Sequence, residues 1–150
     1  MTDLLLACLH HLVVFSLVTI PAIELAQMRG RVCSAKVRHL ARFDATYGVL
    51  AGLTLSIGFA RIFWGAKGAA FFLGNPIFWA KIAFFALAGL ASIVPTLRLL
   101  RWKKAARRDL HFVVPEGELA STRRWLVVEL SLFVPIPLFA AAMARGVGLP

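Results

Sequence analysis

The sequence predicts an all-α integral membrane protein, a four-helix bundle whose helices cross the bilayer in up-down-up-down order with both termini outside. Of its 150 residues, 60% are hydrophobic and only 16% are charged, and the mean hydropathy is +0.80. Soluble domains hold about 45–50% apolar and about 25% charged residues, and disordered chains have low hydrophobicity. Four long apolar stretches, separated by connections rich in basic residues, complete the prediction.

The four apolar stretches are long enough to be membrane-spanning helices. They cover residues 4–28, 44–65, 76–97 and 125–145. At a rise of ~1.5 Å per residue, each helix reaches about 30 Å, which is the thickness of the hydrocarbon core. Transmembrane strands are shorter, about 9–11 residues, and alternate polar with apolar positions. We therefore expect the chain 1–150 to be one transmembrane domain.

Local signals support the first and third spans. No basic residue precedes the first apolar run and no small-residue cleavage site follows it before Arg29, so we expect a span and not a cleaved signal peptide. Asn75 followed by Pro76 predicts the N-cap and first turn of the third helix. We expect that helix to continue over residues 98–112 as a basic surface helix.

The basic residues predict the orientation of the chain. Lys and Arg outnumber Asp and Glu by 17 to 7, which gives a net charge of +10. The whole excess lies in the segments 29–43 and 98–124, whereas the other side has Lys67 in its loop and Arg145 at its rim. By the positive-inside rule both segments are cytoplasmic, which predicts the inner membrane of a bacterium. The charge therefore indicates orientation, and contact with anionic phospholipid, rather than a nucleic-acid partner.

Small residues follow one stripe of the second span. Gly48, Gly52 and Ser56 recur at a four-residue step. In lipid such a stripe lets two helix backbones approach closely, and packing between them then drives association. The pattern is compatible with a seam inside the bundle and equally with a homodimer face.

Three carboxyl groups lie inside the spans near the cytoplasmic face: Glu24, Asp44 and Glu129. Charged groups in lipid are costly and are usually paired. Because the basic segments lie within about a turn, we expect ion pairs with the neighbouring arginines, Arg29, Arg42 and Arg124.

Four further ionisable residues form an outer layer: His10, His11, Arg61 and Lys81. Neighbouring spans run in opposite directions, so all four fall at a similar depth, ~6–10 Å below the outer surface. Neutral imidazole is a ligand for haem iron or a metal, and Arg and Lys pair with propionates, phosphates or other anions. The layer therefore predicts a haem b or similar anionic-cofactor site, with His10 and His11 as candidate metal ligands. The alternative is that both cations reach the headgroups and the histidines hydrogen-bond between helices.

The motifs that hold these residues resemble those of a known family. They are Leu9-His10-His11-Leu12, Tyr47-Gly48, Ala60-Arg61-Ile62-Phe63-Trp64-Gly65, Asn75-Pro76 and Phe78-Trp79-Ala80-Lys81. Over nearly its whole length the chain resembles short bacterial membrane proteins of unknown function. More distantly it is similar to the copper-resistance D and HemJ-like protoporphyrinogen oxidase group. That similarity implies a haem b ligand at His10 or His11 and a matching lysine at Lys81.

The sequence leaves several functions open. The first is haem b or anionic-cofactor binding for electron transfer or haem-pathway redox chemistry. Since both histidines inside the spans belong to the first one, this requires a single-histidine site, a second ligand of another type, or a haem shared across a dimer. The alternatives are a non-catalytic subunit or scaffold of a membrane complex, and a small transporter. No Walker, Rossmann or nucleophile-elbow motif is present in the sequence.

Overall fold

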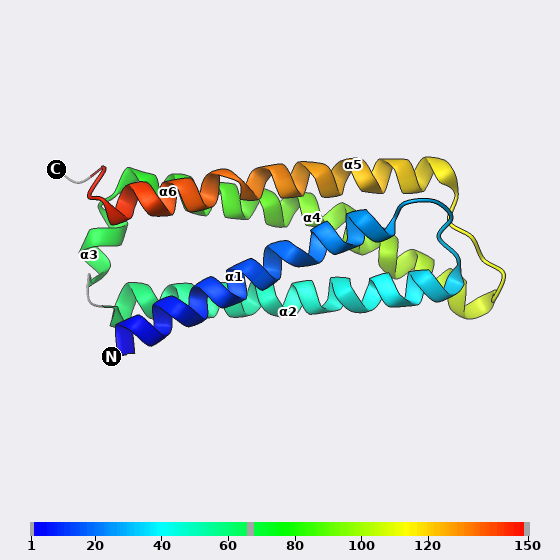
Figure 1. Cartoon of the computed structure of the whole chain (residues 1–150), viewed down its shortest axis with the longest axis horizontal. Coiled ribbons are helices and arrows are strands. Elements are labelled where there is room, and N and C mark those ends of the chain that lie inside the picture. Colours follow the sequence, from blue (N-terminus) through cyan, green and yellow to red (C-terminus); the bar gives the residue numbers. More distant parts are fainter. Residues whose placement is uncertain (1, 66–67, 149–150) are drawn as a thin grey trace.

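The long helices of the chain lie side by side along one axis. The computed structural model describes residues 2–65 and 68–148, so the expected outer-loop residue Lys67 lies outside the described residues. Helix α1 (Thr2–Gln27) and α2 (Ser34–Trp64) are followed by the short α3 (Gly68–Leu73). Helix α4 (Pro76–Arg108) precedes α5 (Glu116–Phe133) and α6 (Pro135–Ala144). Figure 1 shows both chain ends and α3 at one end of the bundle, which we call the terminal end.

Four helical paths are long and apolar enough to cross a membrane: α1, α2, α4, and α5 continued by α6. They run in alternating directions (Figure 1), and the described residues form no strand. The all-α membrane bundle is therefore confirmed. The fourth path is interrupted at Val134, because Pro135 has no N–H to donate to the preceding turn. An extended apolar surface on these helices faces outward, so the bundle contacts the lipid bilayer.

The helices extend past the apolar spans at the end opposite the termini, which we call the basic end. Compared with the expected spans, α2 begins earlier, at Ser34, and α5 begins earlier, at Glu116. Helix α4 continues further, to Arg108. The basic segments are thus largely helical, because Lys, Arg and Ala are good helix formers even where hydropathy falls. Hydropathy marks the lipid-exposed part of a helix and not its polar continuation. The expected extension of α4 is present as far as Arg108.

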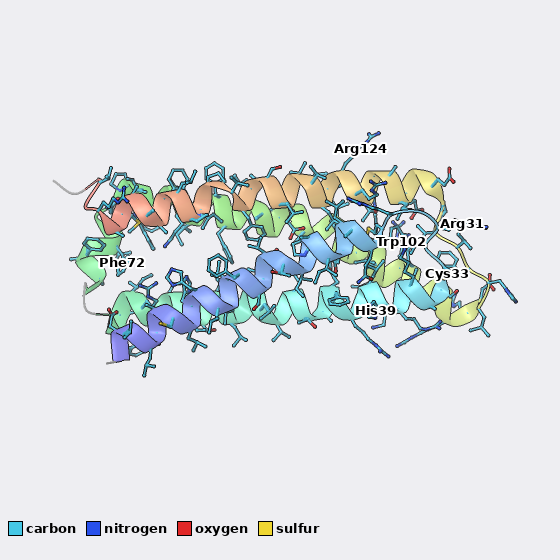
Figure 2. The ribbon with its side chains drawn as sticks, in the orientation of Figure 1. Arg31, Cys33, His39, Phe72, Trp102 and Arg124 are labelled. Carbon is cyan, nitrogen blue, oxygen red and sulfur yellow. The ribbon has the colours of Figure 1, made fainter. Side chains whose placement is uncertain are left out.

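Two loops close the basic end and are bonded to each other. The Val114 N–H donates to the Val32 carbonyl over 3.0 Å. The Ser34 hydroxyl lies 3.0 Å from the Asp109 carbonyl and 3.2 Å from that of Phe112. Buried side chains from several helices pack behind these loops, and Figure 2 shows Trp102 pointing into this region. The two basic connections therefore form one structural unit.

The helices pack as a ring in which each contacts its neighbours. Helix α1 lies against α2 and α5, and α4 lies against α2, α5 and α6. Within the described residues α1 and α6 make no contact, so the ring is closed by α1 and α5 only toward the basic end. Figure 1 shows α1 and α6 diverging toward the terminal end. Polar side chains on the inner faces fall into two layers, one in each half of the bundle.

Candidate functional site

The layer near the terminal end brings together three of the four residues expected there. His10 on α1 faces α2, where its Cε1 lies 3.6 Å from the position that a Cβ on Gly58 would occupy. A Cβ there would be in ordinary van der Waals contact with the ring, so the imidazole packs closely against α2. The charges of Arg61 on α2 and Lys81 on α4 both act on this imidazole. We call His10, Arg61 and Lys81 the cationic cluster.

His11 lies on a different face of α1 and does not join the cluster. Its side chain is exposed, and its Nδ1 lies 2.6 Å from the Ala7 carbonyl of the same helix. The rings of His10 and His11 are perpendicular, with centroids 6.2 Å apart. The ~100° turn between consecutive helical residues sends the two side chains out in different directions. The two histidines therefore do not converge on one ligand within this chain, and a ligand role for His11 stays a prediction.

Two buried polar atoms of the cationic cluster lack hydrogen-bond partners. The His10 Nδ1 and the Arg61 Nε are buried, and neither has a hydrogen-bond partner. The Lys81 ammonium lies 5.3 Å from the centroid of the Phe78 ring, a favourable cation–π arrangement. An acid is also near this end of α2, since an Asp3 Oδ1 lies 3.1 Å from the Cβ position of Gly65. Two cations beside an imidazole can hold a carboxylate or phosphate.

The second layer lies in the half of the bundle toward the basic end. Glu24 on α1, Asp44 on α2 and Glu129 on α5 are buried, with 3%, 9% and 1% of their surfaces exposed. We call these three carboxyl groups the acid layer. None of them forms an ion pair; in residues 2–65 and 68–148 the ion pair found joins Arg101 and Glu118. The expected pairing with Arg29, Arg42 and Arg124 was wrong, because those three side chains are exposed on outward faces.

Hydroxyl groups, not cations, accompany the acid layer. The Thr96 hydroxyl donates to the Asp44 carboxylate over 2.6 Å. The Tyr47 hydroxyl lies near the Glu129 carboxyl group and the Ser92 hydroxyl. One oxygen of Glu24 and one of Glu129 are buried without a partner. No three metal-ligating side chains in the described part of the chain are placed to hold an ion.

A groove between α2 and α4 leads to the acid layer. Its volume is about 370 Å³, and its polar lining residues are Asp44, Tyr47, Ser92 and Thr96. Gly48 and Gly89 line it as well, and no atom lies within 4 Å of where their Cβ would be. The missing side chains therefore keep the groove open on the outer surface of the bundle.

Sequence reasoning did not identify the acid layer as a site. A signal was present, because Glu24 lies on the same stripe of α1 as His10, and Tyr47 on the same stripe of α2 as Arg61. The nearby basic segments instead suggested ordinary ion pairs. Which way the arginines point depends on helix rotation within the bundle, and Figure 2 shows Arg124 projecting away from it.

The small-residue stripe lies on the outside of the monomer. Gly48, Gly52 and Ser56 are all exposed, and space beyond both glycines is open. The Ser56 hydroxyl bonds to the Gly52 carbonyl of its own helix over 2.9 Å. Of the two expectations for this stripe, a seam inside the bundle is therefore wrong. A lipid-facing or dimer-forming surface remains.

Comparison with known proteins identifies the family. A family model described as "Predicted membrane protein (DUF2214)" matches residues 2–148, so the chain belongs to this family. No curated protein and no solved structure matches it. The resemblance to membrane proteins of unknown function is thereby confirmed, whereas the more distant similarity to the copper-resistance D and HemJ-like group stays a prediction.

Proposed function

We propose that this DUF2214 member binds an anionic ligand at the cationic cluster, with haem b held through its propionates as the leading candidate. The observation that carries the proposal is the buried His10 Nδ1, which has no partner and lies close to two cations. Buried polar atoms are nearly always satisfied, so a buried nitrogen without a partner supports a ligand at this position. The cations Arg61 and Lys81 supply the charge that an acidic ligand requires.

The residues of the cluster fit the two chemical ends of haem b. The imidazole of His10 would hold the iron, while Arg61 and Lys81 would pair with the propionates. Bound haem supplies one-electron redox chemistry, which would suit electron transfer or haem-pathway oxidation. Since His11 faces outward, it would not hold the same iron, and any second ligand would be a different group or a residue of a second copy of the chain.

Absorption spectroscopy of the detergent-purified protein tests the iron site. After expression with adequate haem supply, we expect a Soret band that His10→Ala abolishes. His11→Ala is the matched control and should retain the band, because that ring bonds to its own helix. A wild-type protein without the band, or a band that persists in His10→Ala, would exclude His10 as a haem ligand.

Binding of iron-free porphyrin tests recognition of the propionates separately from ligation of the iron. Iron-free protoporphyrin IX should bind and raise the melting temperature of the apoprotein, whereas its dimethyl ester, which lacks free carboxylates, should not. Arg61→Gln and Lys81→Gln should each weaken the free acid about tenfold, the equivalent of losing about 1.4 kcal/mol of charge-assisted hydrogen bonding. Equal binding of acid and ester would contradict propionate recognition by these cations.

A second candidate function is that of a non-catalytic membrane subunit, which we propose forms a homodimer through Gly48, Gly52 and Ser56. It is favoured by the open space beyond the two glycines. Gly52→Leu should abolish a dimer seen by cross-linking in native membranes. Ala86→Leu, at an exposed position on α4, is the control. A dimer that survives Gly52→Leu would exclude this face.

We also propose that the protein resides in a bacterial inner membrane, with the basic end in the cytoplasm against anionic phospholipid. Exposed arginines surround that end. A groove of about 580 Å³ between the two loops and the start of α5 is lined by Arg31 and Arg123, and also by Glu116. Such arginines attract anionic headgroups by about 1 kcal/mol each. Vesicles with and without anionic lipid should therefore differ in how well they stabilise the protein.

A further inference from the structure

The acid layer lacks a counter-charge from every helix packed around it. On α4 the nearest basic group is Arg98, and its guanidinium donates instead to the Glu118 carbonyl and the Thr122 hydroxyl. The basic side chains that follow or precede the layer on the other helices are all exposed: Arg29, Arg38, His39, Arg42, Arg123 and Arg124. Three buried carboxyl groups of like charge cannot all be ionised in such surroundings without a bound cation.

Two of the carboxyl groups are also prepared to take a ligand. Glu24 and Glu129 are almost completely buried, with only 3% and 1% of their surfaces exposed. Each nevertheless has an oxygen without any hydrogen-bond partner. The Asp44 carboxylate differs, because Thr96 already donates to it. Glu24 and Glu129 are therefore the positions at which an added donor would satisfy an unpaired acceptor.

The groove between α2 and α4 provides access to these groups. Tyr47 lines the groove, and its hydroxyl lies near the Glu129 carboxyl group. Ser92 lines the groove as well, near the same hydroxyl, and donates to the Gly89 carbonyl over 2.8 Å. Two exchangeable O–H groups are thus placed between the outer surface of the bundle and a buried carboxyl group.

We propose that the acid layer is a proton-binding site, at which Glu24 or Glu129 carries an exchangeable proton that passes through Tyr47. Binding converts a carboxylate into a neutral carboxyl group: Tyr47 gives its hydroxyl proton to Glu129 and receives another from a hydronium ion or water in the groove. Release is the reverse and returns the proton to a water or hydroxyl acceptor. The proton suits the site because no three metal-ligating side chains in the described residues are placed around one ion. The proposal is independent of the cationic cluster.

Labelling with dicyclohexylcarbodiimide, an apolar reagent that adds to protonated carboxyl groups, tests the site in the full-length protein in native membranes. We expect peptide mass spectrometry to find the adduct on Glu24 or Glu129, with a yield that falls at least tenfold as the pH is raised. Glu24→Gln or Glu129→Gln should remove the adduct at its own position. Glu116→Gln, at an exposed position on α5, is the matched control.

Measurements on the wild-type protein alone can overturn the proposal, so the test does not require any variant to fold. Absence of the adduct from both residues at every pH, together with no infrared band of a protonated carboxyl group, would overturn it. Protection by sodium at constant pH would also overturn it and would assign the site to sodium. His10→Ala should leave the labelling unchanged. A negative result for the proton site is therefore distinguishable from a negative result for ligand binding at the cationic cluster.

Discussion

The Thr96 hydroxyl on α4 donates a 2.6 Å hydrogen bond to the Asp44 carboxylate on α2, and so joins two helices across 52 residues of sequence. The short distance is that of a charge-assisted bond. Both residues line the groove between α2 and α4, so this bond fixes the register of the two helices at the entrance to the acid layer. It therefore supports the fold and shapes the proposed proton site.

Removing the Thr96 hydroxyl should destabilise the bundle. Thr96→Val keeps the shape of the side chain but leaves Asp44 without its donor, which should cost about 1–3 kcal/mol. The measurement is the free energy of unfolding by denaturant in detergent micelles. Thr46→Val is the control, because Thr46 is exposed and bonds to the Arg42 carbonyl of its own helix. It should change stability by less than about 0.5 kcal/mol, and equal losses in the two variants would contradict the role of the interhelical bond.

At the basic end, we expect Glu118 to stabilise the fold through Trp102 and not through Arg101. The buried Trp102 indole donates to a Glu118 oxygen over 2.7 Å, whereas the Arg101 guanidinium lies 3.8 Å away and is 65% exposed. Glu118→Ala should cost about 1–3 kcal/mol, since the indole N–H loses its acceptor. Arg101→Ala should cost less than about 1 kcal/mol, as is usual for exposed ion pairs. Thermal unfolding followed by tryptophan fluorescence measures both.

Glu118→Gln separates charge from hydrogen bonding in the same contact. The amide oxygen of Gln still accepts from Trp102 but has no charge for Arg101. Near-native stability in this variant is therefore expected. A loss as large as that of Glu118→Ala would mean that the ion pair carries the stability.

The fold followed from hydropathy because lipid imposes the same requirement on every span: twenty or so apolar residues in a helix. The Asn75 cap was equally local, and the structure contains it. The grouping of His10 with Arg61 and Lys81 could be predicted, because the three residues lie at a similar depth in their spans and on the inward stripes of their helices. The acid layer was not predicted, because we expected Glu129 to pair with Arg124 from their nearness in the sequence, although five helical positions at ~100° each put the two side chains on nearly opposite faces. The bond between Val32 and Val114 joins distant loops, and no local pattern marks it.

The Cys33 thiol should react at lower pH than an ordinary cysteine. It lies at the N-cap of α2, and the backbone N–H of Lys36 is the main cause that lowers the pKa of this thiol. A lowered pKa means that thiolate, the reactive form, is present below the usual pH range, so the alkylation rate should begin to rise at a lower pH. The measurement is the rate of labelling by a charged maleimide across pH in a Cys8→Ser background. A pH profile equal to that of a free thiol in a peptide would contradict it.

The same reagent tests the orientation of the protein. If the basic end is cytoplasmic, the charged maleimide should label Cys33 in inverted membrane vesicles but not in intact spheroplasts. The matched control is a cysteine introduced at the opposite end, Arg145→Cys, which should show the reverse pattern. Labelling of Cys33 from outside would place both termini in the cytoplasm.

At the terminal end, Asn75 should control both the start of α4 and the tail that follows α6. Its side chain is fully buried; Oδ1 accepts from the Ile77 N–H over 2.9 Å, and Nδ2 donates to the Val147 carbonyl over 3.1 Å. Asn75→Ala loses both bonds and should cost about 1–2 kcal/mol in thermal stability. Asn75→Ser keeps a capping acceptor but has no amide to reach the tail. It should lose less stability than Asn75→Ala while residues 145–148 exchange amide hydrogen faster, because the tie to the tail is broken. Unchanged exchange of this tail in Asn75→Ser would show that the amide does not hold it.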